Sequence, residues 1–460
     1  MKKTEYDKLT SKYQKDFLNS LKEFVAIDSV YDESSKSEAN PYGQGVSKAL
    51  KYVEDLAKKD GFVVTNYANR VVEILYGNGP KNLTIMAHAD VVPVGSGWEH
   101  DPFMMKDNKG VLTGRGVADD KGPLLASYYA LKALKDNKML SDDYQIRFLV
   151  GGDEERGSSC MEYYFEELKK PQPTYGFSPD SDFPLIFAEK GIIGFSASYK
   201  IDLPNILSVK GGLAHNSVID KCDVTTHLDL NFLNFIMDKF HRNEAAIHTE
   251  EDVTTVTFFG KTAHGSTPEL GVNAGMIALD AIAKYTKNAD LAKVVKTFSS
   301  LDGSSYGCAG KSKEMGKNSS NVGIITYENG VLTLIVNFRY VDTCDKKELM
   351  KNIKENAKPG KVEFLGESPL LYYPLDSKLV TTLLSIYQKE TDDLETKPIA
   401  TGGGTYAKEA KNVVAFGMQF PGWDSKMHSA GEGSKKEDLF KAMSIYARAI
   451  VELGAIVKEK

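Results

Sequence analysis

The stretch FLVGGDEERGS, residues 148–158, joins a buried apolar segment directly to three carboxylates. Its apolar beginning, FLV, favours a strand inside a sheet. Two glycines then end the strand and allow the backbone to approach another group closely. Asp153, Glu154 and Glu155 follow at the carboxyl end of this strand. Because adjacent anions repel one another, this position indicates a bound cation, and an acidic surface turn is the alternative.

The composition is that of a globular protein with several domains. A chain of 460 residues exceeds one ordinary hydrophobic core, so we expect two or three domains. Its hydrophobic fraction of 42% and charged fraction of 26% are those of soluble globular chains rather than disordered ones. The net charge of −6, without a lysine or arginine run, argues against a nucleic-acid partner.

The compartment is predicted from what the sequence lacks. The polar start MKKTEYDKLTSKYQKDF has no apolar segment of the kind found in signal peptides. No run of about 18 apolar residues occurs, so we expect no membrane partner. The four cysteines are far apart and form no CxxC pair, which is typical of reduced thiols. We therefore predict a cytoplasmic protein.

The order of expected elements predicts an α/β fold with an inserted domain. Strands and helices alternate in the first part, which favours a largely parallel sheet flanked by helices. From about residue 187 the segments become β-rich, with helical spacing at 229–240, 272–286 and 346–356. We interpret this part as an α+β insertion of two similar halves. The predicted boundaries are 1–186 and 377–460 for the α/β domain and 187–376 for the insertion.

Other expected strands in the first domain also end in candidate ligands. LTIMAHAD ends in His88 and Asp90, which are two positions apart and therefore point to the same side of a strand. A carboxylate there would fix the tautomer of the imidazole. GRGVADDKGP presents Asp119 and Asp120 at a helix start, where capping explains only one of them. Within FSPDSDFP, a short expected strand ends in Pro179-Asp180. Ligands collect at the carboxyl ends of parallel strands, so these residues are expected at the same edge as Glu154 and Glu155.

Four later segments place polar groups in loops or at strand ends. GKTAHGSTPE carries His264, and VNFRY carries Arg339, for which a solvated surface charge is the alternative. The glycines at 402–404 can present backbone N–H groups to an anionic ligand, and a flexible connection is the alternative. KMHSAGE places His428 four residues before Glu432.

Six motifs in this order resemble the co-catalytic zinc amidohydrolase and metallopeptidase family, which includes aminoacylase, acetylornithine deacetylase and carnosinase. They are HxD after an apolar strand, GRGxxDDKG, DEE, SPD, GxxAHxSxP and a late HxxxE. HADVVPVGSGWEHDPF, GRGVADDKGP, FSPDSDFP and TGGGTYA are most similar to the bacterial V-type dipeptidases. The resemblance covers nearly the whole chain. It implies that the α/β domain is catalytic and that the insertion is a lid.

The resemblance also implies two divalent metal ions, with zinc expected and manganese or cobalt as alternatives. The implied ligands are His88 and Asp180 for one ion, Glu155 and His428 for the other, and Asp119 between them. Asp119 is preferred over Asp120 because relatives with a single acid place it directly after the small residue. Asp180 is preferred over Asp182 because it follows Ser-Pro. Glu154 would be the general base and Asp90 would orient His88.

In the lid, the resemblance implies a substrate-facing histidine and arginine, which match His264 and Arg339. His264 would hydrogen-bond the oxyanion, and Arg339 would pair with a substrate carboxylate. Asn216 in GGLAHNSVID matches a lid asparagine, although the surrounding motif departs from the usual pattern. Outside the predicted lid, Gly403 in the glycine segment 402–404 is a further candidate for substrate binding.

The predicted function is therefore that of a dinuclear metal-dependent dipeptidase, a cytoplasmic hydrolase. It would cleave short peptides with free termini by a metal-bound hydroxide, with Glu154 as the base. An N-acyl amino acid deacylase of the same family is the alternative. A non-catalytic metal-binding protein is a third reading, which the presence of Glu154 argues against. The doubled lid can place His264 over its own site, so a monomer is expected, with a homodimer as the alternative.

Overall fold

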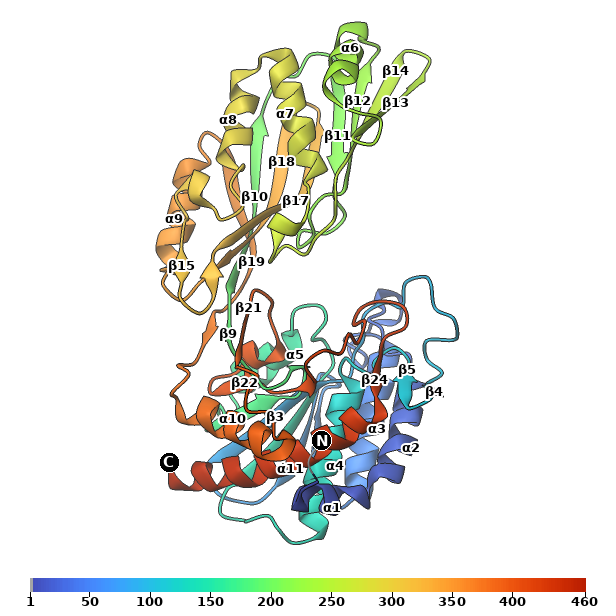
Figure 1. Ribbon diagram of the computed structural model, residues 1–460, viewed down its shortest axis with the longest axis vertical. Coiled ribbons are helices and arrows are strands. Elements are labelled where there is room, and N and C mark those ends of the chain that lie inside the picture. Colours follow the sequence, from blue (N-terminus) through green and yellow to red (C-terminus); the bar gives the residue numbers. More distant parts are fainter. Residues whose placement is uncertain (1–2) are drawn as a thin grey trace. The chain divides into compact units, whose positions relative to one another are not determined.

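The computed structural model describes residues 3–460, which form two compact units (Figure 1). Unit 1 contains the chain up to Phe187 together with Tyr373–Ile399 and Thr405–Lys460. Unit 2 contains Ala188–Tyr372 and Ala400–Gly404. Within the described residues, no helix has the length and apolar character needed to cross a membrane.

The sheet of unit 1 has a parallel centre and antiparallel edges. Its strand order is β1-β2-β6-β3-β7-β22-β9, in which β6, β3, β7 and β22 run parallel. The bounds are β1 (Val63–Tyr67), β2 (Val71–Tyr76), β3 (Asn82–His88), β6 (Gln145–Gly151), β7 (Tyr175–Ser178), β9 (Ile186–Glu189) and β22 (Val413–Ala415). All seven residues of β3 are buried, as expected for a central strand. The predicted α/β class is confirmed.

Helices cover this sheet, and two of them pack on each other and on β3. These two are α4 (Lys121–Asp136) and α11 (Lys436–Glu459). α4 is buried along most of its length because LLASYYALKAL is apolar on nearly every face. The other helices are α1 (Glu5–Ser11), α2 (Gln14–Val25), α3 (Gln44–Lys59), α5 (Ser159–Glu162) and α10 (Lys378–Thr391). A π-helix, Tyr163–Glu167, continues α5.

Smaller strand pairs connect the loops of unit 1. β24 (Gly433–Lys435) pairs with β5 (Val111–Thr113), which pairs with β4 (Lys106–Asn108). β23 (Met418–Gln419) pairs with β8 (Ser181–Asp182). These pairs join the end of the chain to the loops that precede α4 and follow β7.

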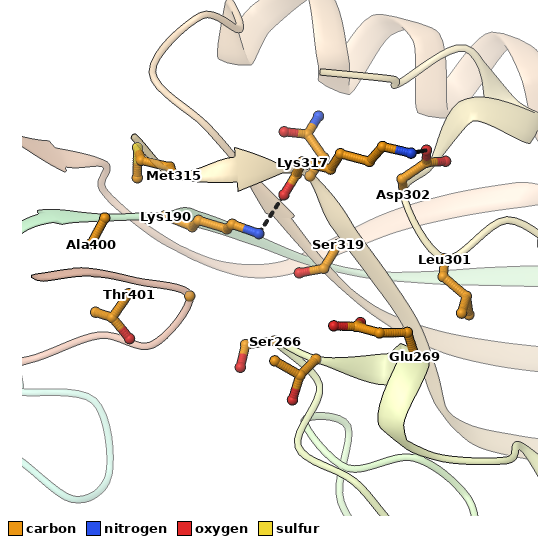
Figure 2. Close-up of a pocket in the computed structure, with 13 residues that line it drawn as sticks. Lys190, Ser266, Glu269, Leu301, Asp302, Met315, Lys317, Ser319, Ala400 and Thr401 are labelled. Carbon is orange, nitrogen blue, oxygen red and sulfur yellow. Dashed lines mark hydrogen bonds and ion pairs between the residues drawn. The ribbon is translucent and has the colours of Figure 1, made fainter. Parts of the chain in front are cut away.

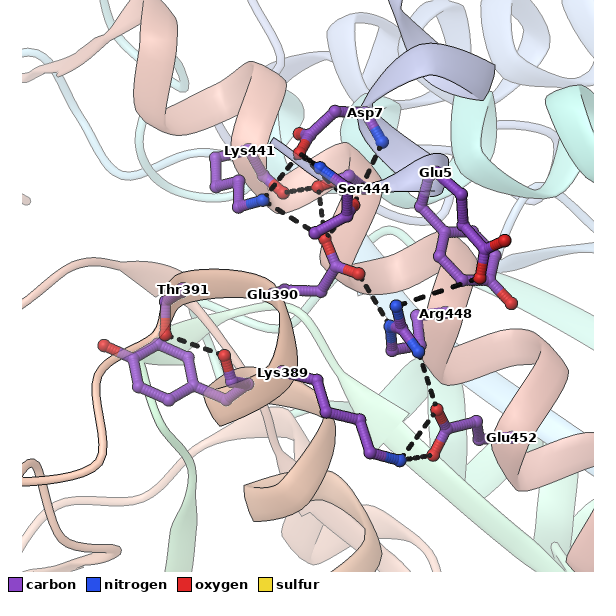
Figure 3. A network of polar contacts seen from close by, with 12 residues as sticks. Glu5, Asp7, Lys389, Glu390, Thr391, Lys441, Ser444, Arg448 and Glu452 are labelled. Atoms are coloured by element: carbon purple, nitrogen blue, oxygen red, sulfur yellow. Dashed lines mark hydrogen bonds and ion pairs between the residues drawn. The ribbon is translucent and has the colours of Figure 1, made fainter. Parts of the chain in front are cut away.

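A buried ion-pair network fastens α1 and α10 to α11 (Figure 3). The carboxylate of Glu390 on α10 is fully buried and accepts hydrogen bonds from Lys441 at 3.1 Å and Arg448 at 2.6 Å. Thr4, which caps α1, donates to the same carboxylate at 2.7 Å. Asp7 also accepts from Lys441 at 2.8 Å. The network therefore joins three helices that are far apart in the sequence.

Unit 2 is built on one antiparallel sheet of eight strands, in the order β13-β14-β12-β11-β17-β18-β10-β19. The bounds are β10 (Gly191–Lys200), β11 (Ile206–Gly211), β12 (Lys221–His227), β13 (Ala245–Glu250), β14 (Val253–Phe259), β17 (Ser319–Glu328), β18 (Val331–Tyr340) and β19 (Lys361–Ser368). Asn329 and Gly330 join β17 to β18 with positive φ at both positions, as a tight hairpin turn requires.

The helices of unit 2 are α6 (Leu230–Lys239), α7 (Ala274–Thr286), α8 (Ala289–Thr297) and α9 (Lys346–Asn356). Figure 1 shows α7 and α8 along the sheet, and their apolar residues join the strands in one core. Helical spacing predicts three of them and not α8, which is short and follows α7 after two residues.

The five residues 400–404 belong to unit 2 although their neighbours in sequence belong to unit 1. The backbone N–H of Lys190 donates to the carbonyl of Thr401 at 3.2 Å. The guanidinium of Arg339 donates to the carbonyl of Gly402. These contacts are long-range in sequence, and the single predicted segment 377–460 does not anticipate them.

Candidate metal centre

The predicted metal and base residues of unit 1 lie at the end of a strand or in loops at one edge of its sheet. β3 ends at His88, β6 ends just before the carboxylates at 153–155, and β7 ends just before Asp180. These three strands are parallel and β3 pairs with both others, so their carboxyl ends meet. Asp119 comes from the loop before α4, and His428 comes from the loop between β23 and β24.

The carboxylate of Asp119 lies between the two histidines. Its Oδ1 is 3.1 Å from Nε2 of His88, and its Oδ2 is 2.8 Å from Nε2 of His428. Each histidine has one further carboxylate beside it. Oδ2 of Asp180 is 3.6 Å from His88, and Oε2 of Glu155 is 3.4 Å from His428. One carboxylate with an oxygen on each side is the arrangement that two neighbouring cations can share.

These donors fit divalent cations. The ligand atoms of His88, Glu154 and Asp180 lie within 4.8 Å of one another, and so do those of His88, Asp119 and Glu155. Oε1 of Glu155 is buried and has no hydrogen-bond partner among the described residues. Mixed imidazole and carboxylate donors suit zinc, manganese or cobalt. A buried carboxylate oxygen without a donor is the atom that a cation would satisfy.

The electrostatics of the cluster indicate an excess of buried negative charge. Burial raises the pKa of Glu154 well above its ordinary value, and burial with the nearby charge of Asp119 raises the pKa of Glu155 to about 7. Burial also raises the pKa of Asp180. Burial lowers the pKa of His88, but hydrogen bonds to neighbouring carboxylates outweigh this and hold it well above its usual range. Cations would relieve this repulsion and leave both imidazoles neutral.

Asp90 holds the strand ends together from behind the cluster. Its backbone carbonyl is 3.0 Å from Nδ1 of His88, and its carboxylate is 3.4 Å from the same nitrogen. The two carboxylate oxygens accept the backbone N–H groups of Glu154 and Glu155, each at 3.1 Å. Asp90 therefore fixes the imidazole mainly through its main chain and fixes the two glutamates through its side chain.

Comparison with known proteins shows the family to which the chain belongs. The model of peptidase family M20/M25/M40 matches residues 84–452. The chain belongs to this family. It is therefore a metallopeptidase. A protein of Staphylococcus aureus strain USA300, which carries the provisional name dipeptidase, is 34% identical over 96% of this chain and 97% of its own length.

Solved structures share the fold of this M20 enzyme. Human carnosine dipeptidase 1 has a TM-score of 0.59 with 15% identity, and the match covers 98% of each chain. A dipeptidase of Saccharomyces cerevisiae has a TM-score of 0.58 with 14% identity, again over 98% of each chain. At this identity the likeness concerns the fold alone.

Several buried residues around the M20 centre were not predicted as site residues. Oδ2 of Asp120 accepts the backbone N–H of His88 at 3.0 Å, so the second aspartate of the pair supports the histidine. The ammonium of Lys121 donates to the carbonyls of Phe24 and Ile27, and burial lowers its pKa to about 7. Arg115 and Glu432 form a buried ion pair. The GRG and HxxxE motifs contain the last two, but their pairing was not visible in the sequence.

Unit 2 contains His264, which is predicted to be catalytic, and Arg339, Asn216 and Gly403, which are predicted to bind substrate. Nη2 of Arg339 is 3.5 Å from Nε2 of His264. The backbone carbonyl of Asn216 accepts the N–H of Gly265, next to His264, at 2.7 Å. Gly403 follows the carbonyl to which Arg339 donates. The structure therefore brings these four segments together within the unit.

A polar pocket of 640 Å³ adjoins this group within unit 2 (Figure 2). It is lined by Ser266, whose hydroxyl is 2.6 Å from Nδ1 of His264, and by Gly402, which accepts from Arg339. Lys190 also lines it and donates to the carbonyl of Lys317. Its remaining lining residues are Thr267, Glu269, Leu301, Asp302, Met315, Lys317, Asn318, Ser319, Ala400 and Thr401.

Proposed function

We propose that this metallopeptidase is a dipeptidase with two metal ions, which hydrolyses the peptide bond of short peptides with free termini. The carrying observation is that Asp119 has one oxygen beside each of two histidines, each of which has a further carboxylate. The provisional name of the Staphylococcus aureus relative, which matches almost end to end, supports a dipeptide substrate.

In this proposal the chain holds the ions through five residues. His88 and Asp180 would hold one ion, Glu155 and His428 would hold the other, and Asp119 would contribute to both. Divalent ions bound there supply Lewis-acid polarisation of the peptide carbonyl and acidify water. Zinc is the proposed metal, with manganese and cobalt as alternatives that the same donors accept.

Glu154 is the carboxylate left over when Glu155 acts as a ligand. We assign it the role of general base, which takes a proton from water and delivers it to the leaving amine. The backbone N–H of Glu154 donates to the carboxylate of Asp90 at 3.1 Å, which limits how far the Glu154 side chain can move between water and the leaving amine. The Glu154 carboxylate also lies close to His88 and Asp180, so the alternative role is that of a metal ligand. Replacement of Glu154 distinguishes a general base from a metal ligand.

The residues of unit 2 would bind the ends of the substrate. Burial lowers the pKa of Arg339 to about 10, so the guanidinium stays charged at neutral pH and can pair with the terminal carboxylate. Burial and the charge of Arg339 lower the pKa of His264, which favours a neutral imidazole that can donate to the oxyanion. Asn216 and Gly403 would complete the contact, and the adjoining polar pocket would receive the side chain of the C-terminal residue.

The test is a comparison of substrate classes with defined metal content. Purified protein loaded with zinc, manganese or cobalt is assayed on free dipeptides, N-blocked dipeptides and N-acetyl amino acids. We expect cleavage of free dipeptides and two ions per chain by elemental analysis. Cleavage of N-acetyl amino acids alone would instead identify a deacylase, and an intact dipeptide panel would exclude the proposed function.

We further propose a cytoplasmic monomer. All four cysteines are free, which fits a reducing compartment. The eight-stranded sheet of unit 2 is completed by a single chain, so both halves of the lid are already present in one copy. Light scattering on active protein tests the monomer directly, since a mass near twice 50.7 kDa would contradict it.

A further inference from the structure

The side chain of Glu432 is fully buried and serves as a common acceptor for the loop that carries Asp119. Its Oε1 accepts three backbone N–H groups, from Gly116 at 2.9 Å, Ala118 at 3.1 Å and Asp119 at 3.2 Å. Its own backbone carbonyl accepts the N–H of Gly114 at 3.0 Å. One residue near the end of the chain therefore fixes a loop more than 300 positions earlier.

The other carboxylate oxygen of Glu432 is held by Arg115, which is 1% exposed. The guanidinium also donates to the carbonyls of Pro93 at 3.2 Å and Val94 at 3.4 Å. It lies over the ring of Trp98, 5.4 Å from the centroid. Because its guanidinium has partners on several sides, Arg115 cannot rotate away from Glu432 without breaking several contacts. Both oxygens of Glu432 are thus engaged in positions that a metal ligand would need free.

Strand pairing fixes the position of Glu432 relative to the loop that carries Asp119. Gly433, the first residue of β24, pairs with Thr113, the last residue of β5. The chain on one side of this pair leads back to His428, and on the other side it leads on to Asp119. Oδ2 of Asp119 and Nε2 of His428 then meet at 2.8 Å. Glu432 therefore lies beside the strand pair that joins the segment of Asp119 to the segment of His428.

The remaining candidate ligands are positioned by other means. His88 is the last residue of β3, Asp180 follows β7, and both strands are central in the sheet. The backbone of Glu155 is held by Asp90 at 3.1 Å. Loss of the Glu432 contacts would therefore disturb the Asp119–His428 side of the centre more than the His88–Asp180 side.

We propose that Glu432, held by Arg115, is a positioning residue that fixes the carboxylate of Asp119 against His428. It would thereby set the affinity for the ion at Glu155 and His428, which we call the second metal ion. This inference rests on the proposed two-metal centre. Partners that orient metal ligands typically change metal affinity by about 10–100-fold when replaced. Glu432→Gln keeps the size of the side chain but presents an amide N–H₂ either to Arg115 or to the backbone donors, so one of the two sets of contacts is lost.

The experiment measures stepwise metal binding by calorimetry, together with the absorption spectrum of the cobalt-loaded protein. The variants are Glu432→Gln and Arg115→Lys, which keeps the charge but loses the fork of donors. Glu390→Gln is the matched control, because Glu390 is also a fully buried glutamate paired with basic side chains in unit 1. Thermal unfolding of the metal-free proteins records the purely structural effect of each change.

We expect Glu432→Gln to weaken the second binding step by about 10–100-fold and the first step by much less. Arg115→Lys should show a smaller shift in the same step, and Glu390→Gln should lower only the unfolding temperature. With excess metal, kcat of Glu432→Gln should recover while KM for a dipeptide stays unchanged. The step that His428→Ala removes identifies which ion is affected.

Two results would overturn the inference. One is an unchanged second step in both Glu432→Gln and Arg115→Lys, with unfolding temperatures lowered as in the control. The other is an equal loss of both steps, which would mean a general loss of structure. If Glu432→Gln does not fold, Arg115→Lys alone decides between these outcomes. A wild-type protein that binds a single ion would instead contradict the proposed function itself.

Discussion

Replacement of Asp90 by asparagine tests whether this side chain aligns the two glutamates after β6. In the native structure, Oδ1 accepts from the backbone N–H of Glu154 and Oδ2 accepts from that of Glu155, each at 3.1 Å. Asparagine has the same shape but only one acceptor oxygen. Its N–H₂ group must therefore face one of the two backbone N–H groups, whichever way the amide is turned.

The size of the effect follows from the lost acceptor. A buried donor left without a partner costs about 1–3 kcal/mol. The Asp90 site is 2% exposed, so water has little access to replace the carboxylate. If that cost falls on the aligned conformation of the glutamate loop, kcat should fall by about 10–100-fold, since 1.4 kcal/mol is a factor of ten. The binding of the ion held by Glu155 should weaken over a similar range.

The assay is steady-state hydrolysis of a free dipeptide at saturating metal, with metal content measured on the same samples. We expect a reduced kcat, a KM within a few-fold of wild type and retained binding of the ion at His88, whose ring is also held by the Asp90 main-chain carbonyl. Wild-type kcat in Asp90→Asn would refute the reasoning. So would complete loss of both ions, which would place the main role of the carboxylate on His88.

Four further predictions test separate parts of the molecule. Glu154→Gln should lower turnover by at least about 100-fold with both ions still bound; retained turnover would exclude the base, and loss of an ion by elemental analysis would indicate a ligand. Arg339→Met should lower kcat/KM for a free dipeptide far more than for its C-terminal amide, and equal losses would contradict a carboxylate contact. Glu390→Gln should lower the free energy of unfolding in denaturant by about 3 kcal/mol with kcat unchanged, since it breaks a buried ion pair remote from the centre. Removal of metal by a chelator should abolish hydrolysis, and added zinc should restore it; activity that survives demetallation would exclude a metal-dependent reaction.

The sequence predicts the edge of the sheet at which the site forms, because the ends of parallel strands must meet. His88, Glu154, Glu155 and Asp180 each follow an apolar run, and the structure brings them together. The order of the strands could not be derived in the same way. β6 lies between β2 and β3 in the sheet although it follows both in the chain, and no local pattern in the sequence encodes this order.

Contacts between distant segments also escaped prediction. The grouping of 400–404 with unit 2 depends on hydrogen bonds to Lys190 and Arg339 that no local pattern encodes. The helix α8 is nine residues long, and its short apolar spacing is weak on its own. The ion pair of Arg115 with Glu432 spans more than 300 positions, and each residue alone is typical of an exposed turn.

The acids of the site divide into two classes that share the same chemistry. Asp119, Asp180 and Glu155 have oxygens directed at the imidazoles. The other acids accept backbone N–H groups from the segments that carry these ligands. Asp90 accepts from Glu154 and Glu155, and Asp120 accepts from His88. Glu432 accepts from Gly116, Ala118 and Asp119.

This division explains how so many carboxylates can lie close together in a buried place. An anion that accepts backbone N–H groups is partly stabilised without a cation, because these donors offset some of the cost of burying its charge. An anion that lacks such donors, as Oε1 of Glu155 does, depends on a cation for its stability. The acids that accept backbone N–H groups therefore keep the loops in place, and the acids directed at the imidazoles would supply the metal affinity. Which class an acid joins depends on which backbone donors the fold brings near it, so the residues alone left the pair Asp119-Asp120 open. The family resemblance favoured Asp119, and in the structure Asp119 faces both imidazoles while Asp120 accepts the backbone N–H of His88.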